Sequence, residues 1–169
     1  MSRVYVTSDW HLGHKGISNK FRKEFSTDEE HDGVIYDNAH SVLTKRDTLL
    51  CLGDMAFTLE GLEMIRALPG RKILVRGNHD EFPLDRYVGV FDDVRGAMSY
   101  KGAFLTHIPI HPMELYRGAN IHGHCHKGGP FEMLEGECCR SYFNAILEFN
   151  DYTPVPMDEV WEILDARVQ

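Results

Sequence analysis

The segment Arg3-Val4-Tyr5-Val6-Thr7-Ser8-Asp9-Trp10-His11 joins a short β-branched and aromatic run to an Asp-x-His motif. The run is typical of a β-strand, so it places the aspartate and the histidine just after a strand end. Four other polar motifs also follow strand-like stretches: Gly53-Asp54, Gly77-Asn78-His79-Asp80, His107 alone, and Gly123-His124-Cys125-His126. Carboxylate, imidazole and amide groups that converge at strand ends suit hard to borderline divalent cations. The five motifs together therefore predict a metal site.

The spacing of apolar residues predicts how the chain alternates between helices and strands. Helical periodicity indicates helices over 28–43, 58–68 and 157–168, and Thr27 with Glu30 resembles a capping box for the first of them. Short apolar runs indicate strands over 3–7, 48–52, 72–75, 88–91, 97–100, 103–106, 119–121 and 141–149. We therefore expect an α/β fold, a four-layer α/β-β/α sandwich of two mixed sheets flanked by helices, with the metal site at strand ends.

Length, charge and cysteine content narrow the class of protein. The 169 residues fit one domain, which we expect to span 1–169. A formal charge of −8 argues against a long nucleic-acid ligand, although two bound cations would reverse the field at the site. We expect no membrane partner, because no apolar run approaches the roughly 20 residues of a span. No signal peptide precedes the first strand and the four cysteines form no CxxC pair, so we expect a cytoplasmic protein with reduced thiols, in the host cytoplasm if a phage encodes it.

The motif set resembles the calcineurin-like metallophosphoesterase superfamily over nearly the whole chain. The run from 106 to 126 and the tail 150–156 resemble small phosphoesterases common in bacteriophages and bacteria. The resemblance implies two divalent ions per chain, with manganese expected first and iron, zinc or nickel as alternatives. It implies Asp9, His11 and His126 as ligands of the first ion, Asn78, His107 and His124 as ligands of the second, and Asp54 as a bridge between them.

The same resemblance implies the roles of the remaining motif residues. His79 would stabilise the phosphoryl oxygen and protonate the leaving group, and Asp80 would fix its tautomer. The nucleophile would be a hydroxide that bridges the two metals.

The local backbone around the ligands is also predicted. On an extended segment, residues two apart point the same way, so His124 and His126 can both face the ions. Each of Gly53, Gly77 and Gly123 precedes a ligand and would let the chain turn tightly at a strand end.

One stretch departs from the better-known phosphatases of the superfamily. Met55-Ala56-Phe57 follows Asp54, where those enzymes carry a further Asp and an Arg. Other groups must therefore hold the phosphate, and the candidates are His14, Lys15, Asn78, Arg46 and Arg76, with His14 placed first because it directly follows the Asp-x-His motif. Because the metals would carry most of the phosphate charge, we expect a small or cyclic nucleotide-type phosphodiester as substrate.

Two other classes of function stay open at this point. A phosphomonoesterase or protein phosphatase is the first, and the absence of the Asp and Arg continuation counts against it. A non-catalytic scaffold is the second, and the retention of His79 with every ligand counts against it. Outside the site, we expect His31 and His40 on the surface of the first helix and no ligand role for His111 or His122. The oligomeric state stays open.

Overall fold

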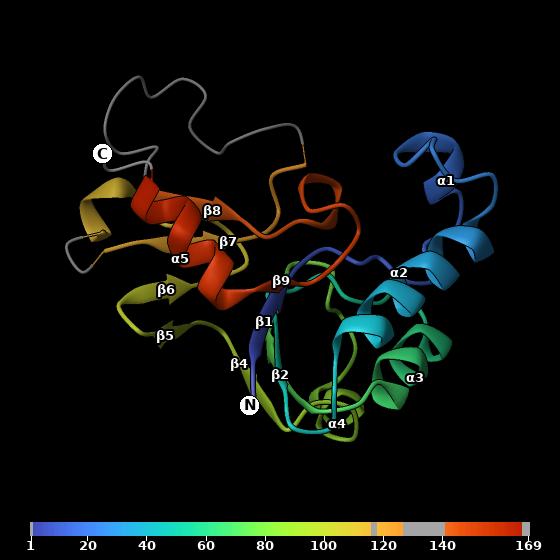
Figure 1. Ribbon diagram of the computed structural model, residues 1–169. Coiled ribbons are helices and arrows are strands. Elements are labelled where there is room, and N and C mark those ends of the chain that lie inside the picture. Colours follow the sequence, from blue (N-terminus) through green and yellow to red (C-terminus); the bar gives the residue numbers. More distant parts are fainter. Residues whose placement is uncertain (1, 116–117, 127–140, 167–169) are drawn as a thin grey trace.

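The computed structural model describes residues 2–115, 118–126 and 141–166 (Figure 1). Its helices are α1 (Ile17–Lys20), α2 (Asp28–Val42), α3 (Leu59–Ala67), α4 (Leu84–Val88) and α5 (Met157–Ala166), with short 3₁₀ helices η1 (Pro112–Glu114) and η3 (Leu147–Phe149). Its strands are β1 (Val4–Thr7), β2 (Thr48–Cys51), β3 (Arg71–Val75), β4 (Asp93–Arg95), β5 (Met98–Tyr100), β6 (Ala103–Leu105), β7 (Asn120–His122), β8 (Tyr142–Asn144) and β9 (Val155–Pro156).

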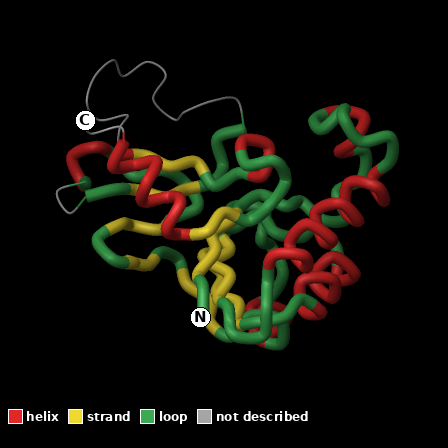
Figure 2. The backbone as a smooth tube through the Cα atoms, viewed as in Figure 1, coloured by secondary structure: helices red, strands yellow, loops and turns green. Residues whose placement is uncertain are grey.

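The strands form two mixed sheets. The first has the order β4-β3-β2-β1-β9, in which β1 to β4 run parallel and β9 antiparallel. The second has the order β5-β6-β7-β8, in which β5 is the antiparallel strand. Helices α2 and α3 cover the side of the first sheet that faces away from the second, and α5 packs against β1, β8 and β9 (Figures 1 and 2). The prediction of two mixed sheets flanked by helices is confirmed.

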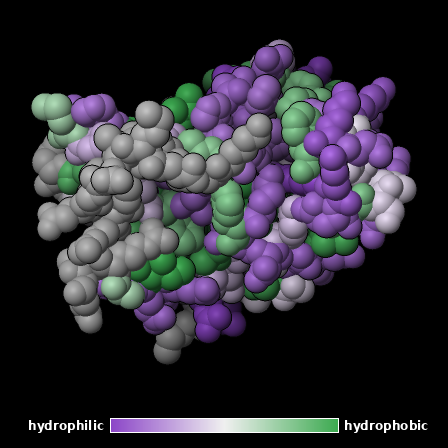
Figure 3. All heavy atoms as spheres, turned by 90° about the horizontal axis from the view of Figure 1, so that it is seen from above, coloured by the Kyte–Doolittle hydropathy of each residue, from purple (hydrophilic) through white to green (hydrophobic). Residues whose placement is uncertain are grey.

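The first sheet is buried on both faces, which explains its nearly continuous apolar strands. In β2 and just after it, Leu49 and Cys51 pack with the residues of α2 and α3, whereas Leu50 and Leu52 pack with the second sheet. This alternation follows from the two-residue period of a strand. The outer surface on the α1 and α2 side is mostly hydrophilic in the view of Figure 3.

Side-chain caps lie at the N-termini of helices α2 and α3. Thr27 accepts a hydrogen bond from Glu30 N at 3.0 Å, and Thr58 accepts one from Gly61 N at 3.1 Å. Such caps satisfy backbone donors that the first helical turn leaves free. The reciprocal half of the predicted capping box differs, because the Glu30 carboxylate accepts from Ser26 N rather than from Thr27 N.

The sequence prediction was wrong in one segment and too long in another. The expected strand over 88–91 is instead the end of α4 and a turn, in which Tyr87 packs in the core beside Phe91. The expected strand over 141–149 is limited to β8, and η3 occupies its end. Helix α1 and strands β4 and β9 were not predicted, because each is too short to show a period. Among the described residues, no helix is long and apolar enough to cross a membrane.

Candidate metal centre

The sequence motifs lie together because they follow neighbouring parallel strands. Asp9, Asp54 and Asn78 come after β1, β2 and β3 of the first sheet. His107 and His124 come after β6 and β7 of the second sheet. Parallel strands end at the same edge of a sheet, and this edge is where ligands bind in α/β folds. A hydrogen bond of 3.0 Å from His124 N to Asp9 Oδ2 joins the two sets of loops.

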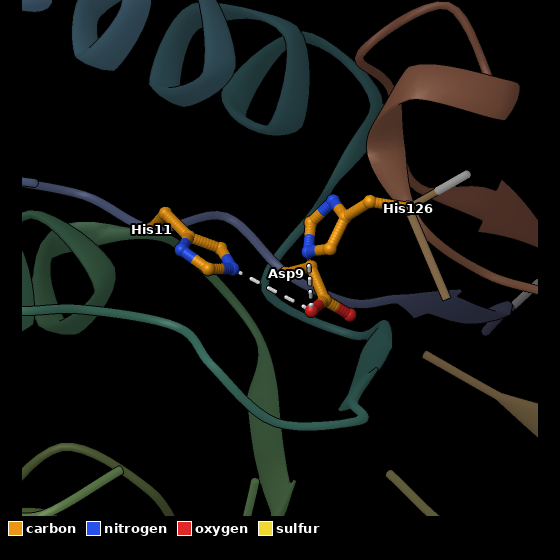
Figure 4. Close-up of side chains that lie close together, drawn as sticks. All are labelled: Asp9, His11 and His126. Carbon is orange, nitrogen blue, oxygen red and sulfur yellow. Dashed lines mark ion pairs between the residues drawn. The ribbon is translucent and has the colours of Figure 1, made fainter. Parts of the chain in front are cut away.

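The first candidate cluster consists of Asp9, His11 and His126, whose ligand atoms lie within 4.8 Å of one another. The Oδ1 atom of Asp9 is 3.5 Å from His11 Nε2 and 3.2 Å from His126 Nε2. Figure 4 shows the two imidazoles on either side of this carboxylate. The other oxygen, Oδ2, accepts hydrogen bonds from Ser8 Oγ and His124 N. The carboxylate is therefore held by one oxygen and presents the other to both rings.

Unpaired buried atoms test whether this cluster fits a cation. Asp9 Oδ1 and His11 Nε2 are buried and have no hydrogen-bond partner within the part of the protein that the structure describes. Buried polar atoms without a partner cost free energy unless something compensates them. A divalent cation would pair with both atoms at once, and carboxylate oxygen with imidazole nitrogen is a donor set that such ions accept. The residues of the first cluster therefore fit a metal ion.

The second candidate cluster consists of Asp54, His107 and His124, with Asn78 beside it. His107 Nδ1 lies 2.8 Å from the carbonyl oxygen of Leu52, so Nδ1 carries the proton that donates to it. In the neutral ring the lone pair of Nε2 then faces two further acceptors, Asn78 Oδ1 at 2.9 Å and Asp54 Oδ2 at 3.3 Å. Acceptors that converge in this way fit a cation between them.

Asp54 lies between the two clusters. Its Oδ2 atom is 3.3 Å from His107 Nε2 and 4.0 Å from His11 Nε2, while its Oδ1 atom accepts a hydrogen bond from His79 N at 2.8 Å. The two clusters have the division of ligands that the resemblance implies, and they fit a binuclear site. Bridging by Asp54 stays a prediction with which this position agrees.

The electrostatics of the first cluster favour positive charge. Burial raises the pKa of Asp9, but the nearby imidazoles of His11 and His126 outweigh this effect and hold that pKa well below its usual range. Burial lowers the pKa of His126, but the Asp9 and Glu148 carboxylates together have a larger effect and raise it to about 9. The carboxylates thus stabilise a positive charge at His126, which a bound cation supplies in place of a proton.

Four of the candidate ligands adopt left-handed backbone conformations. The φ angles are 58° for Asp9, 55° for His11, 55° for Asp54 and 69° for His124. The expectation of an extended segment at His124 was therefore wrong, although the ligands converge as expected. Non-glycine residues rarely adopt positive φ, and such residues concentrate at functional sites.

The glycines that precede the ligands have two different roles. Gly53 has a φ of 95°, and so makes the tight turn that we expected. Gly123 does not have a positive φ, but a Cβ there would overlap Ser8 Oγ and Asp9 Oδ2. A Cβ at Gly77 would likewise overlap Asp54 Oδ1. These two glycines allow the close approach of another loop, so the turn prediction was wrong for them.

His79 lies beside the clusters, but Asp80 does not contact it through a hydrogen bond. The imidazole of His79 is exposed, and its ring centroid is 5.9 Å from that of His11. The buried Asp80 carboxylate accepts from the backbone N–H groups of Asp54, Met55 and Gly77, at 2.9, 3.2 and 2.8 Å. Asp80 therefore holds the two loops together, and the structure does not support it as the partner of His79.

The expected phosphate-binding residues are only partly brought to the site. The His14 ring centroid lies 6.1 Å from that of His11, and its buried Nδ1 atom has no hydrogen-bond partner among the described residues. Arg46 lies before β2, at the opposite end of that strand from Asp54, so the expected substrate contact was wrong. The Arg76 guanidinium donates to the carbonyl oxygens of Asp80 and Phe82. Lys15 is exposed.

Two charged residues beside the first cluster had no signal in the sequence. Glu148 Oε1 is 2.9 Å from His126 Nδ1, and the buried Arg22 pairs with the other oxygen of Glu148 at 3.0 Å. The two residues are 126 positions apart, so no local pattern connects them.

His31, which we expected on the surface, is fully buried against Arg22, and that expectation was wrong. His40 is exposed as expected, and His122 is buried outside both clusters.

A cavity of about 400 Å³ opens beside His79. It is lined by Ala56, Phe57, His79, Glu81, Phe82 and Pro83. The Phe57 ring lies 5.3 Å from the His79 ring and 5.2 Å from the His11 ring, so the cavity adjoins the first cluster. Its walls are mostly apolar, with Glu81 as the acidic group.

Comparisons with known proteins agree with this site. A family model described as calcineurin-like phosphoesterase matches residues 2–167. The chain is 27% identical to an uncharacterised protein of Methanocaldococcus jannaschii, over 98% of this chain and 93% of that protein. It is 38% identical to the Gene 66 protein of Mycobacterium phage L5, over 51% of this chain and 44% of that protein. The crystal structure of a protein of unknown function from Aquifex aeolicus gives a TM-score of 0.78 at 29% identity, covering 96% of this chain and 100% of that one.

The family match spans nearly all of the chain, and the residues of both clusters lie within the matched range. Their carboxylate and imidazole groups suit divalent metal ions. Sequence, fold and site thus agree that this chain belongs to the calcineurin-like phosphoesterase family.

Proposed function

We propose that this chain is a phosphodiesterase that hydrolyses small or cyclic nucleotide-type phosphodiesters, with two divalent cations, manganese first among them. Family membership and the two clusters support the broader class of metal-dependent phosphoesterases. The observation that carries the proposal is the position of His79, which lies between Asp54 and a largely apolar cavity. A phosphate held at the clusters would have an ionisable imidazole and a largely apolar cavity on the same side.

The residues of the site divide the chemistry between them. Divalent cations held by Asp9, His11 and His126 and by Asp54, Asn78, His107 and His124 would neutralise the phosphate and bring the pKa of a coordinated water towards neutrality. Asp54 fixes the backbone of His79 through the 2.8 Å hydrogen bond from His79 N. The exposed His79 imidazole can then donate a proton to the leaving oxygen, as a general acid does.

The cavity beside His79 suits the organic leaving group of an ester. Phe57 and Phe82 offer aromatic walls, and the Phe82 backbone is fixed by a hydrogen bond of 3.2 Å from Phe82 N to Tyr87 Oη. Glu81 would repel a leaving group that carries negative charge. An uncharged ring, such as a nucleoside base or an aryl group, therefore fits best.

The preference for diesters is supported by how the nearby arginines are used. The Arg22 guanidinium donates to the carbonyl oxygens of Asp9 and Trp10, and that of Arg76 donates to the carbonyl of Phe82. All five N–H donors of Arg22 have partners within the protein, so Arg22 cannot bind the outer oxygens of a monoester dianion without breaking one of these bonds. A diester carries a single negative charge at its phosphate, so it needs less positive charge from side chains.

Two esters with the same leaving group test the proposal. With manganese supplied, kcat/KM for bis(p-nitrophenyl) phosphate should exceed that for p-nitrophenyl phosphate. The His79→Ala variant is the control, because activity that belongs to this site must fall in it. A clear preference for the monoester would assign a phosphomonoesterase instead. Metal-loaded protein that hydrolyses neither these esters nor a panel of cyclic nucleotides would favour a binding module.

A further inference from the structure

Glu148 contacts the candidate ligand His126 at the ring nitrogen that does not face the cluster. Its Oε1 atom lies 2.9 Å from His126 Nδ1, while His126 Nε2 faces Asp9 Oδ1 at 3.2 Å. A carboxylate at Nδ1 accepts the proton of that nitrogen and leaves the lone pair on Nε2, which is the atom that faces the cluster. Glu148 thus selects both the tautomer and the orientation in which His126 meets an ion.

Arg22 fixes Glu148 and the first motif at the same time. Its Nε and Nη2 atoms donate to the two Glu148 oxygens at 3.1 and 3.0 Å, a fork-shaped contact. Nη2 and Nη1 also donate to the carbonyl oxygens of Asp9 and Trp10, at 2.5 and 3.0 Å. The side chain is 1% exposed. A single buried guanidinium therefore ties the carboxylate behind His126 to the strained turn that carries Asp9.

The network continues into helix α2 with every proton assigned. Arg22 Nη1 lies 2.7 Å from His31 Nε2, and His31 Nδ1 lies 2.7 Å from Asp32 Oδ1. His31 can accept at Nε2 and donate at Nδ1 as a neutral ring. The second oxygen of Asp32 accepts from Gly13 N at 2.8 Å, just beyond the first motif. From Arg22 to Asp32 no acceptor faces another acceptor, so this part of the network is complete without a metal.

The second cluster is supported in a different way. His107 Nδ1 is 2.8 Å from a backbone carbonyl, that of Leu52. His124 Nδ1 is 2.9 Å from Asn78 Oδ1, and Asn78 is itself a candidate ligand. Among the described residues, neither ring has a charged side chain behind it, apart from the cluster carboxylates themselves.

We propose that Glu148 and Arg22 are positioning residues for the first metal site alone. The ligands of the two sites are therefore held in place by different kinds of contact. This inference rests on the proposed two-metal function. Loss of Glu148 should weaken one ion and leave the other, because the Leu52 carbonyl and Asn78 are untouched. Partners behind a metal-bound histidine typically change metal affinity by about 10–100-fold.

Calorimetric titration of chelator-stripped protein with Mn²⁺ tests the inference without relying on turnover. Wild-type protein should bind two ions. Glu148→Ala should bind one of them about 10–100-fold more weakly and the other within about twofold. Glu148→Gln keeps an acceptor for His126 Nδ1 but lacks the charge, so its loss should be smaller. Glu63→Ala is the matched control, because Glu63 forms an exposed ion pair with Arg66. Its two affinities should match those of the wild type.

Each outcome of the titration has a distinct meaning. Thermal unfolding in chelator first shows that each variant is folded, and the near-isosteric Glu148→Gln variant serves if Glu148→Ala is not. Two unchanged affinities, or equal losses at both sites, would overturn the inference and leave the two-metal proposal standing. A wild-type protein that binds no Mn²⁺ would overturn both.

Discussion

The two candidate metal clusters differ in the groups that contact the Nδ1 atoms of their histidines. In the first, His126 meets Glu148, and a buried Arg22 fixes that carboxylate. In the second, His107 meets the carbonyl oxygen of Leu52, directly after strand β2. The first arrangement depends on side chains from distant parts of the chain, whereas the second follows from the path of the backbone. Side-chain substitutions should therefore change metal binding at the two clusters to different extents.

The largest expected effect comes from the residue that the clusters share. Asp54 faces His107 and His11 with one oxygen and holds His79 N with the other. Asp54→Ala should weaken binding of both ions and reduce activity to background, because their charges lose a common counter-ion. Metal analysis and ester hydrolysis measured together would check this. Two tightly bound ions with a near-normal rate would show that Asp54 does not bridge.

The second largest expected effect is a loss of activity that leaves metal binding at both clusters unchanged. His79→Ala removes the exposed imidazole beside Asp54 and leaves every candidate ligand in place. We expect kcat to fall by about 10²–10⁴ while two ions stay bound. The loss should shrink for diesters with good leaving groups, which need little protonation. Equal losses for good and poor leaving groups, in a kinetic series at saturating manganese, would instead indicate an electrostatic role.

A glycine substitution should disturb one cluster through steric overlap. Gly123→Ala would place a Cβ against Ser8 Oγ and Asp9 Oδ2, so the Asp9 carboxylate must move. We expect affinity for one ion to fall about tenfold or more, in the range seen when the support of a ligand is lost. Gly96→Ala is the control, because a Cβ there meets nothing within 4 Å. Matching Mn²⁺ isotherms for the two variants would show that the Asp9 loop can adjust.

The smallest expected effect concerns acid stability at the start of helix α2. Asp28 accepts hydrogen bonds from Gly16 N, Ser18 N and Ser18 Oγ, and these hold its pKa at about 2, against an ordinary value of 3.8. A lowered folded-state pKa stabilises the protein above about pH 4, and this contribution is lost as the pH falls towards 2. Asp28→Asn should therefore lower the urea unfolding free energy of the metal-free protein at pH 6 more than at pH 3. Equal changes at both pH values would refute this.

Much of the fold and the ligand set was predictable because the signals are local. Thr27 caps α2 as predicted, and the Asp-x-His and Gly-His-x-His motifs lie after strands as expected. The pairing of Arg22 with Glu148 was not predictable, because it joins positions that meet only in the folded chain. Asp80 was misjudged for a similar reason, since its oxygens bind backbone donors of a loop from another strand. The apolar pattern over 88–91 likewise does not distinguish a buried strand from a helix end.

The proposed function requires that two metal ions bind side by side and support ester hydrolysis. The direct measurement is a titration of chelator-stripped protein with Mn²⁺ in which bound metal and hydrolysis of bis(p-nitrophenyl) phosphate are followed together. We expect two ions per chain, magnetic coupling between them in the electron paramagnetic resonance spectrum, and activity that appears as both sites fill. A single ion per chain, or full activity before a second ion binds, would contradict it.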